Sequence, residues 1–411
     1  MRNIGVFEDT TIQFPEKTDP GKAEIHILTG ENGTGKSTVL YALASIFGVY
    51  PNMISRFRFK NPTSLFSVFL DDKSDFGYFF TQEGSLSKYP PISFPHPYTE
   101  KVSSLENTPL DYAFFAYSGY RSMNSTEIKA IQELTIPPLH HALKFDNSID
   151  SAVFTQWVAN NKTKEALELI KNGQGKAERY RKLISRIEEV VAEVIDKKIE
   201  FVLETEPLTL LIKVEGKQLS LDALPDGLKS VISWIADLLM RMDRIKWATD
   251  VEVFDRNFIL FLDEIDVHLH PAWQRKILPA IQKLFKNAQI FVSTHSPFVV
   301  GSVDGAWVHK LVLDEQGNSR AEPPRRSEDG ESYQYILKEV FNIEEQFGVG
   351  TERMLAEFRD IKSKILENQQ YDRVQFLKLA HDIAVQSIEL SSIIGMELRQ
   401  LSRIKQADFS I

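Results

Sequence analysis

Residues Gly30–Thr38, with the sequence GENGTGKST, constrain what this chain can fold into more than any other segment. A glycine, four residues and then Gly-Lys-Ser form the pattern of a phosphate-binding loop, whose backbone N–H groups surround the α- and β-phosphates of a nucleotide. The run before it, AEIHILT, is typical of a strand, and the run after it, VLYALASIF, of a helix. This strand–loop–helix context favours the phosphate loop over a glycine-rich turn that carries a lysine by chance.

Each residue type in this loop has its own chemistry. The lysine reaches the β- and γ-phosphates, the serine hydroxyl binds Mg²⁺, and the glycines let the backbone approach the phosphates. The sequence therefore predicts ATP and Mg²⁺ as cofactors, with Ser37 as a metal ligand. The residues expected to bind the nucleotide are Gly30, Asn32, Gly33, Gly35, Lys36, Ser37 and Thr38.

Composition excludes several other chemistries. The chain has 411 residues and no cysteine, so disulfides, thiolate metal sites and a cysteine nucleophile are ruled out. Its first residues lack the apolar core of a signal peptide, and no apolar run is long enough to cross a bilayer, which predicts a cytoplasmic protein without a membrane partner. A net charge of −9 argues against a protein whose whole surface binds nucleic acid. The alternating bases and aromatics of Arg56–Lys60 favour a half-buried strand over a nucleic-acid contact.

The pattern of apolar residues predicts an α/β fold with a mixed, mainly parallel sheet, because strands alternate with helical segments. SVFLDD and FGYFFTQ predict a β-hairpin, 84–110 a loop, 113–119 a buried strand, and 227–242 a buried helix. Leu183, Ile187, Val190 and Val194 share one face of an expected helix. The predicted domains are an N-terminal lobe (1–124), a helical insert (125–197), a second lobe (198–315) and a helical C-terminal region (330–411).

The turn-rich, charged stretch 314–330 predicts an exposed linker before this C-terminal region. Beyond it, Tyr333, Ile336, Leu337, Val340 and Phe341 form one apolar stripe, and Met354, Leu355, Phe358, Ile361 and Ile365 form another. Packing within the chain is the favoured interpretation of both stripes, and a partner-binding surface is the alternative.

Acidic and imidazole side chains follow two further strands. The apolar strand 258–262 ends in Asp263 and Glu264; the first is placed to hold Mg²⁺ and the second to polarise the attacking water. The run IFVST ends before His295, which is expected to contact the γ-phosphate or the water, with Ser296 as a helix N-cap. The catalytic candidates are therefore Lys36, Glu264 and His295.

Five motifs in order resemble an ABC-type P-loop ATPase head of the RecF, OLD and structural-maintenance-of-chromosomes group. GENGTGKS is similar to Walker A, LPDG at 224–227 to the signature loop, FILFLDE to Walker B, Ile265-Asp266 to the D-loop, and STHSP to the histidine switch. The resemblance implies that two copies sandwich two nucleotides, with Gly227 and Lys229 acting in trans. Pro225 departs from the usual serine and puts that contact in doubt. Gln82 is the Q-loop candidate, with a hairpin role as an equal alternative.

Finer features resemble the defence ATPases typified by PtuA of the Septu system and their retron-associated relatives. These features are LDEIDVHLHPAWQRKILPAIQKLF, FVSTHSPFVV, FTQW, FFAYSGYR and the helical tail. Within FFAYSGYR, the alternatives for Tyr117 and Arg121 are that they face the nucleotide, a second subunit or the core. The resemblance implies a homodimer or higher homo-oligomer that controls a separate nuclease, of HNH type, in antiphage defence. Nucleic acid would be engaged through the complex.

Three functions remain open on the sequence. The first is a slowly hydrolysing regulatory ATPase without nuclease activity of its own, because the tail carries no HNH pattern. The second is a RecF- or SMC-like repair ATPase that binds duplex DNA, although no long heptad coiled coil interrupts the head. The third is a module that senses nucleotide without turnover. His268 and His270 suggest zinc only weakly, since no further ligand lies nearby in the sequence.

Overall fold

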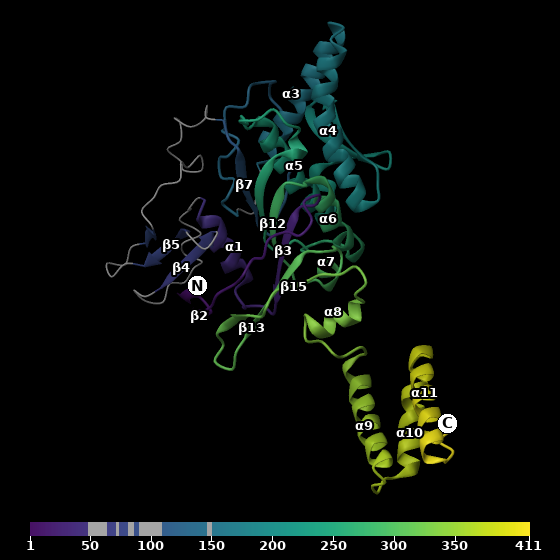
Figure 1. Cartoon of the computed structure of the whole chain (residues 1–411). Coiled ribbons are helices and arrows are strands. Elements are labelled where there is room, and N and C mark those ends of the chain that lie inside the picture. The colour runs from purple at the N-terminus through teal and green to yellow at the C-terminus, as the bar shows by residue number, and fades with distance from the viewer. Residues whose placement is uncertain (48–63, 71–73, 81–85, 90–108, 146–149) are drawn as a thin grey trace. The chain divides into compact units, whose positions relative to one another are not determined.

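The computed structural model describes residues 1–47, 64–70, 74–80, 86–89, 109–145 and 150–411. The chain divides into two compact units, Met1–Ile336 and Leu337–Ile411, which are described separately below. Figure 1 shows the ribbon with its labelled elements. Gln82 and the segment Arg56–Lys60 lie outside the described residues, so their predicted roles have no structural counterpart here.

A seven-stranded, mainly parallel sheet forms the core of the first unit, which confirms the predicted α/β class. Its strand order is β14-β13-β3-β12-β11-β7, with β15 paired to β13. The strands β7, β11, β12, β3 and β13 are parallel, and β14 and β15 run antiparallel to β13. The parallel strands are β3 (Glu24–Gly30), β7 (Tyr112–Tyr117), β11 (Asn257–Leu262), β12 (Ala288–Ser293) and β13 (Trp307–Leu313).

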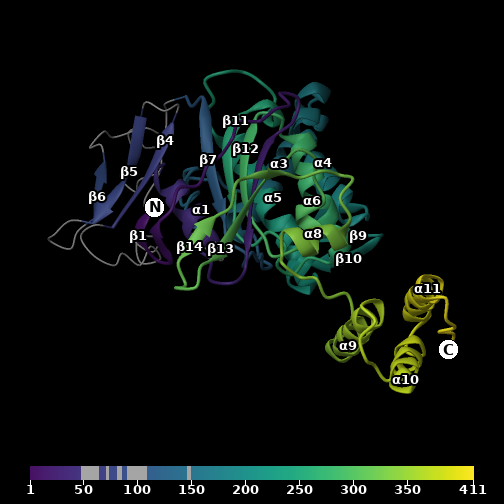
Figure 2. The ribbon, with the colours of Figure 1, turned by 60° about the horizontal axis from the view of Figure 1, so that its bottom comes forward.

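These strands are nearly continuous apolar runs because helices cover both faces of a parallel sheet. Ile27, Leu260 and Val292 on three adjacent strands are completely buried. Figure 2 shows α1 on one side of the sheet and α5 and α6 on the other. The helices of this layer are α1 (Lys36–Ser45), α5 (Asp226–Arg244), α6 (Pro271–Leu284) and the short α7 (Pro297–Val300), with 3-10 turns η1 (Leu221–Ala223) and η2 (Val253–Asp255).

Two antiparallel sheets complete the first unit. One has the order β2-β1-β4-β5-β6 and contains the predicted hairpin, formed by β4 and β5. β6 lies within 84–110, which the sequence predicts as loop. The other sheet has the order β10-β9-β8. The strands are β1 (Arg2–Ile4), β2 (Phe7–Asp9), β4 (Leu65–Leu70), β5 (Ser74–Phe80), β6 (Leu86–Tyr89), β8 (Ile199–Thr205), β9 (Leu208–Val214) and β10 (Lys217–Ser220).

A helical hairpin, α3 (Ser151–Ile170) and α4 (Gln174–Ile195), precedes β8 and packs against α5 and α6. Helix begins at Ser151 rather than near 125; the described residues before it form turns and extended segments, among them Pro137 and Pro138, which cannot donate backbone hydrogen bonds. On α4, Ile187, Val190 and Val194 are buried along the expected face.

The stretch 314–330 is part of the central sheet, so the linker prediction was wrong. Its turn residues form a hairpin, in which Asn318 N–H donates to the Asp314 carboxylate at 2.8 Å and Gly317 has φ +80°. β14 (Ser319–Ala321) and β15 (Arg325–Arg326) then pair with β13. Turn composition indicates a hairpin as readily as a linker, and only the pairing partner distinguishes the two.

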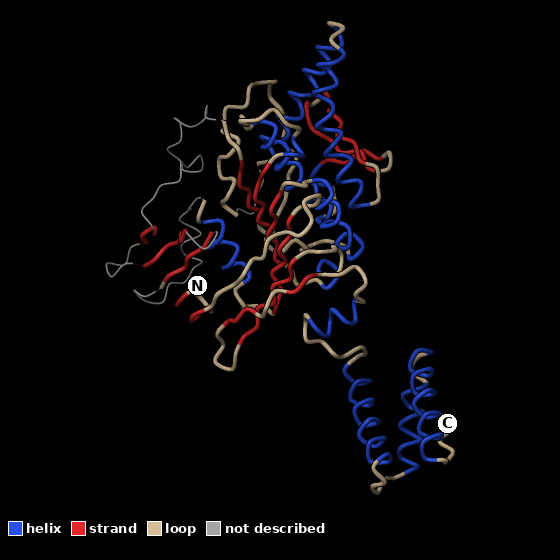
Figure 3. Tube along the Cα trace, viewed as in Figure 1, coloured by secondary structure: helices blue, strands red, loops and turns tan. Residues whose placement is uncertain are grey.

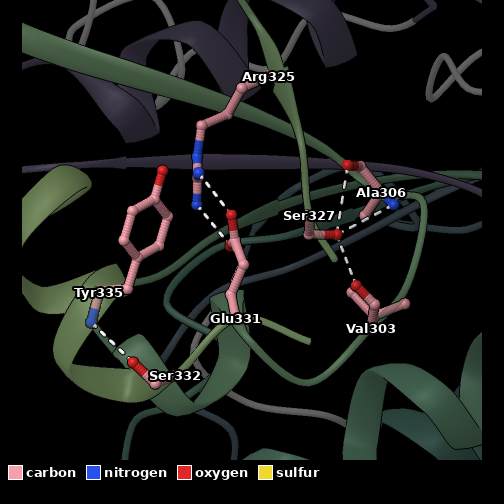
Figure 4. A network of polar contacts seen from close by, with 7 residues as sticks. All are labelled: Val303, Ala306, Arg325, Ser327, Glu331, Ser332 and Tyr335. Atoms are coloured by element: carbon pink, nitrogen blue, oxygen red, sulfur yellow. Dashed lines mark hydrogen bonds and ion pairs between the residues drawn. The ribbon is translucent and has the colours of Figure 1, made fainter. Parts of the chain in front are cut away.

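Polar contacts hold the chain after β15 against the rest of this unit (Figure 4). Arg325 makes a two-point ion pair with Glu331, with N···O distances of 2.9 and 2.8 Å. The buried Ser327 hydroxyl accepts from the N–H of Ala306 at 3.1 Å and donates to the carbonyl of Val303. These bonds fix the segment that leads into α8 (Tyr333–Glu339).

The second unit contains α9 (Val349–Leu366), α10 (Arg373–Ala384) and α11 (Ile388–Lys405), coloured as helices in Figure 3. It has its own apolar core, in which the Phe358 and Phe376 rings stack with centroids 5.0 Å apart. Leu355, Phe358 and Ile365 of the second predicted stripe are buried there, which confirms packing within the chain for that stripe. No helix among the described residues is long and apolar enough to cross a membrane.

Candidate functional site

The phosphate loop joins the end of β3 to the start of α1, and each of its three glycines has a positive φ. At Gly30 (φ +139°), a Cβ would lie 2.2 Å from the carbonyl oxygen of Leu311 on β13. At Gly35 (φ +92°), it would lie 2.5 Å from the ring of Phe7. Gly33 (φ +83°) instead faces open space, with no atom within 4 Å of a built Cβ. The loop therefore packs closely at both ends and leaves room at its tip, as a phosphate cradle requires.

A residue far along the chain braces this loop from behind. The buried Ser319 hydroxyl donates to the carbonyl of Thr34 at 2.7 Å, and the Thr10 hydroxyl donates to the carbonyl of Ser319 at the same distance. Thr34 also donates to the carbonyl of Glu31 at 2.9 Å. At the tip, Asn32 is exposed, while Thr38 is half-buried in the first turn of α1.

Lys36 is the first residue of α1 and its side chain turns back over the loop. Its ammonium donates to the carbonyls of Gly30 at 3.0 Å and Glu31 at 2.8 Å. Burial lowers the pKa of Lys36 to about 8, against the opposing charges of Asp263, Glu264 and Asp266. The ammonium is thus held at the loop, and the three carboxylates act on it electrostatically.

Asp263, just past the end of β11, lies beside the phosphate loop. Its Oδ1 accepts hydrogen bonds from Ser37 at 2.9 Å and Ser293 at 2.6 Å, and its Oδ2 accepts from Tyr41 at 3.2 Å. Ser37 and Asp263 offer the hard oxygen donors that Mg²⁺ prefers. Two cis ligands of an octahedral Mg²⁺ would be about 3 Å apart, so the observed separation fits the ion.

This donor set suits a metal that is shared with substrate phosphates. Among the residues described by the structure, no three His, Asp or Glu side chains form a ready-made metal cluster. Mg²⁺ is typically bound through one or two protein ligands plus phosphate and water oxygens. His270 instead caps α6, its Nδ1 accepting from the N–H of Ala272 at 3.2 Å, and His268 lies beside the exposed ring of Tyr120.

Glu264 and His295 complete the same edge of the sheet. Burial raises the pKa of Glu264, and the neighbouring carboxylates of Asp263 and Asp266 add to the rise. Burial lowers the pKa of His295, and the Lys36 charge lowers it further, so a neutral imidazole is favoured. Asp266 Oδ1 accepts from the Thr294 hydroxyl at 2.5 Å and from the His295 N–H at 3.3 Å. The D-loop candidate therefore anchors the backbone that carries His295.

The signature candidates lie at the start of α5. Pro225 is its N-cap residue, and Gly227 is buried in the second helical position. A Cβ on Gly227 would lie 2.5 Å from the carbonyl oxygen of His268, so this glycine permits close packing between α5 and the segment after Asp266 within one chain. The Lys229 side chain is 17% exposed, and its Nζ lies 3.8 Å from Oδ1 of Asp226.

The structure thus brings together residues from three distant segments: Lys36 and Ser37, then Asp263, Glu264 and Asp266, and finally His295. The sequence reasoning missed three side chains that organise them, namely Tyr41, Ser293 and Ser319. Ser293 lies within the STHSP motif, so its position beside the acidic strand end was a usable signal. Ser319 carried no local signal, because its contact depends on the pairing of β13 and β14.

Comparisons with known proteins agree with this geometry. The chain is 22% identical over 395 residues to the Septu protein PtuA of Bacillus thuringiensis, covering 92% of this chain and 93% of that relative. It is 33% identical over 141 residues to the retron Ec83 probable ATPase of Escherichia coli, and that alignment covers 34% of this chain. The chain thus spans only a quarter of the length of this retron ATPase, 25%. These matches confirm the predicted resemblance to PtuA and retron ATPases.

Solved structures and a family model add to the comparison. The SMC head bound to the C-winged helix domain of ScpA has a TM-score of 0.45 at 14% identity, covering 79% of this chain and 96% of that one. The family model described as "AAA domain, putative AbiEii toxin, Type IV TA system" matches residues 25–301, from β3 to the end of α7. Since this match covers most of the chain and contains Lys36, Asp263, Glu264 and His295, the chain belongs to that AAA domain family.

Proposed function

We propose that this chain binds Mg-ATP and hydrolyses it slowly. The observation that carries the proposal is the 2.9 Å hydrogen bond between Ser37 and Asp263, which joins the phosphate loop to the acidic strand end. Separate elements supply the two oxygen donors, and they meet where the metal of a phosphoryl-transfer site is held. The intact set of Lys36, Asp263, Glu264 and His295 supports turnover rather than nucleotide sensing alone.

In this mechanism a water oxygen attacks the γ-phosphorus in line, and the bond from that phosphorus to the ADP oxygen breaks. Glu264 orients the water and accepts its proton, and its raised pKa suits that role. Lys36 binds the β- and γ-phosphate oxygens, and neutral His295 donates a hydrogen bond to the γ-phosphate or to the water. Bound Mg²⁺, held by Ser37 and Asp263, would supply charge neutralisation at the phosphates.

Two copies of the chain form the working unit in this proposal. Gly227 and Lys229 of one copy approach the γ-phosphate held by the other, as the ABC-type resemblance implies. Pro225 removes a hydroxyl and a backbone N–H from that contact, which favours slow turnover. The described residues of the first unit, Met1–Ile336, build the nucleotide head with the α3–α4 hairpin as a helical insert, and Leu337–Ile411 form the C-terminal helical region.

The physiological role follows from the likeness to PtuA and the retron ATPases. The chain acts as the regulatory ATPase of an antiphage defence complex and controls a separate HNH-type nuclease. ATP-driven closure of the two heads changes the geometry presented to that partner. Nucleic acid is engaged by the complex and is not cut by this chain alone.

Phosphate release and nucleotide binding test this function together. Wild-type protein should release phosphate from ATP only with Mg²⁺. Glu264→Gln should retain Mg-ATP binding and lose about 10²–10⁴-fold in kcat, the usual contribution of a general base. Lys36→Ala should weaken binding. Equal turnover by wild type and Glu264→Gln would refute the base assignment.

A cleavage assay tests the division of labour. The purified chain should leave duplex and single-stranded DNA intact with Mg²⁺ or Mn²⁺ present. Robust cutting by the chain alone would contradict the assignment of cleavage to a partner.

A further inference from the structure

The turn that follows β7 lies against Glu264, and it carries Arg121, for which the sequence leaves the nucleotide, a second subunit and the core as alternatives. β7 is the neighbour of β11 in the sheet, with Tyr117 opposite Leu262. The pairing continues one step further, because the N–H of Asp263 donates to the carbonyl of Tyr117 at 2.9 Å. The next residues, 118–121, therefore pass directly beside the catalytic glutamate.

Glu264 has an unusual backbone conformation. Its φ is +47°, in the left-handed region. Residues other than glycine adopt this region uncommonly, and those that do are often found at functional sites. Among the described residues, none donates a hydrogen bond to its carboxylate. The direction of the side chain therefore depends on what holds the backbone and on what the side chain packs against.

Arg121 holds the carbonyl side of this backbone. Its side chain is 5% exposed, and burial lowers its pKa to about 10, so it stays charged at neutral pH. Nη2 donates to the carbonyl of Asp263 at 2.7 Å and, more distantly, to that of Glu264 at 3.5 Å. Nε donates to the carbonyl of Ser118. One rigid guanidinium thus joins the β7 turn to the two peptide groups that flank the glutamate.

Ser293 holds the amide side. The hydroxyl of this fully buried residue at the end of β12 accepts from the N–H of Glu264 at 2.7 Å and donates to Asp263 Oδ1 at 2.6 Å. Its carbonyl accepts from the N–H of Ile265 at 3.1 Å. The peptide groups before and after Glu264 are therefore fixed from two neighbouring strands.

Gly119 borders the side chain itself. A Cβ built on Gly119 would lie 2.8 Å from both Cβ and Oε2 of Glu264, closer than real Cβ contacts allow. The φ of Gly119 is not in the left-handed region, so alanine is compatible with its backbone. Both contacts that are too short involve Glu264, whereas Val267 Cγ2, at 3.5 Å, would be in ordinary van der Waals contact.

We propose that Gly119, Arg121 and Ser293 are positioning residues that set the direction of the Glu264 carboxylate toward the attacking water. Arg121 and Ser293 act through the backbone on either side of the glutamate, and Gly119 acts by leaving space for its carboxylate. This inference rests on the proposed ATPase function and adds a specific dependence of kcat on the β7 turn.

Gly119→Ala is the sharpest test, because it adds one methyl group next to the glutamate. We expect kcat for ATP to fall about 10²-fold, the usual effect of a displacement near 1 Å at a reacting group. The Kd for Mg-ATP should stay within about twofold, because the phosphate loop is untouched. Gly175→Ala is the matched control, since a Cβ there meets nothing within 4 Å and its backbone is likewise compatible.

Double variants separate positioning from general damage. In a Glu264→Gln background, Gly119→Ala should cause no further loss of the residual turnover, because residues that act as a unit are non-additive. Arg121→Lys should likewise lower kcat about tenfold or more with Kd little changed. Ser293→Ala should lower kcat as much, and it is measured at saturating Mg²⁺ because it also removes the hydrogen bond to Asp263. Ser302→Ala, which removes a 2.8 Å bond to the Val299 carbonyl, is the control for the serine variant.

The outcomes are distinguishable from failure of the proposed function. Wild-type turnover that does not exceed that of Lys36→Ala would overturn the ATPase proposal and this inference with it. Normal wild-type turnover, with Gly119→Ala unchanged in kcat, would overturn the inference alone. The same holds if Gly119→Ala remains equally harmful in the Glu264→Gln background. Because Arg121 is buried and its variants can unfold, Gly119→Ala is the deciding variant.

Discussion

The hydroxyl of Tyr117 donates a 2.8 Å hydrogen bond to Oδ2 of Asp237, joining the end of β7 to the middle of α5. Both residues are buried, and the same carboxylate oxygen also accepts from Nε of Arg241 at 2.6 Å. The strand that positions Glu264 is therefore tied to the helix whose first turn carries the signature candidates. Tyr117 and Arg241 thus share one oxygen of a buried carboxylate.

Tyr117→Phe should destabilise the first unit by about 1–3 kcal/mol, because it leaves a buried carboxylate short of one donor. Tyr112→Phe, on the same strand but 52% exposed, should change the stability by less than about 0.5 kcal/mol. Urea unfolding followed by tryptophan fluorescence suits this test, since all five tryptophans lie in the first unit. Equal stability of the two variants would contradict the role given to this bond.

Mg-ATP binding should weaken as the pH rises through the pKa of Lys36, about 8 in the free protein. The phosphates raise that pKa, so the stabilisation by the charged lysine is fully present below pH 8 and is lost above it. The Kd for Mg-ATP should therefore be constant below pH 8 and rise by up to tenfold for each pH unit above it. Calorimetry in buffers of different ionisation enthalpy should show an uptake of about 0.9 proton at pH 9. Lys36→Arg should show no such pH dependence, because its guanidinium stays charged.

Gly33→Ala should weaken Mg-ATP binding more than it lowers stability, because the proposed function places phosphate in the open space beside Gly33. We expect at least about a tenfold rise in Kd, with about 1 kcal/mol of destabilisation from the positive φ. Gly317→Ala is the matched control: its φ of +80° is nearly the same and its surroundings are equally open, but it lies in the β13–β14 hairpin. That variant should lose stability alone, and any comparable loss of binding would count against the cradle.

Ser37→Ala should raise the Mg²⁺ concentration needed for half-maximal turnover by about 10–100-fold, because it removes one of the two protein oxygens proposed to hold the metal. Ser45→Ala, on the same helix with its hydroxyl bonded to the Ala42 carbonyl at 2.8 Å, is the control. A magnesium titration of phosphate release, with total ATP held constant, measures the shift. An unchanged magnesium requirement in Ser37→Ala would remove Ser37 from the metal site.

The parts of the site predictable from the sequence are those encoded by short, local patterns. Lys36 and Ser37 follow a glycine spacing that few other structures need, and Asp263 and Glu264 end an apolar strand. Because the carboxyl ends of parallel strands meet at one edge of a sheet, their proximity followed once the sheet was predicted. The mainly parallel sheet was itself predictable from alternating strands and helices.

The parts that escaped prediction depend on the register between distant segments. Arg121 meets the Asp263 carbonyl across 142 residues of sequence, and only the pairing of β7 with β11 brings them together. Gly119 looks like an ordinary turn glycine until its neighbour is known. The linker prediction for 314–330 failed for a related reason, because hairpin turns and linkers are rich in the same residue types.

The brace behind the phosphate loop links the loop to a strand made much later in synthesis. Ser319 follows Thr34 by 285 residues, so the ribosome completes the loop long before the hydroxyl that supports it exists. β13, whose Leu311 carbonyl oxygen lies against Gly30, is likewise synthesised long after the loop. During synthesis, the hydroxyl that braces the phosphate loop therefore becomes available only after the last hairpin of the central sheet has emerged.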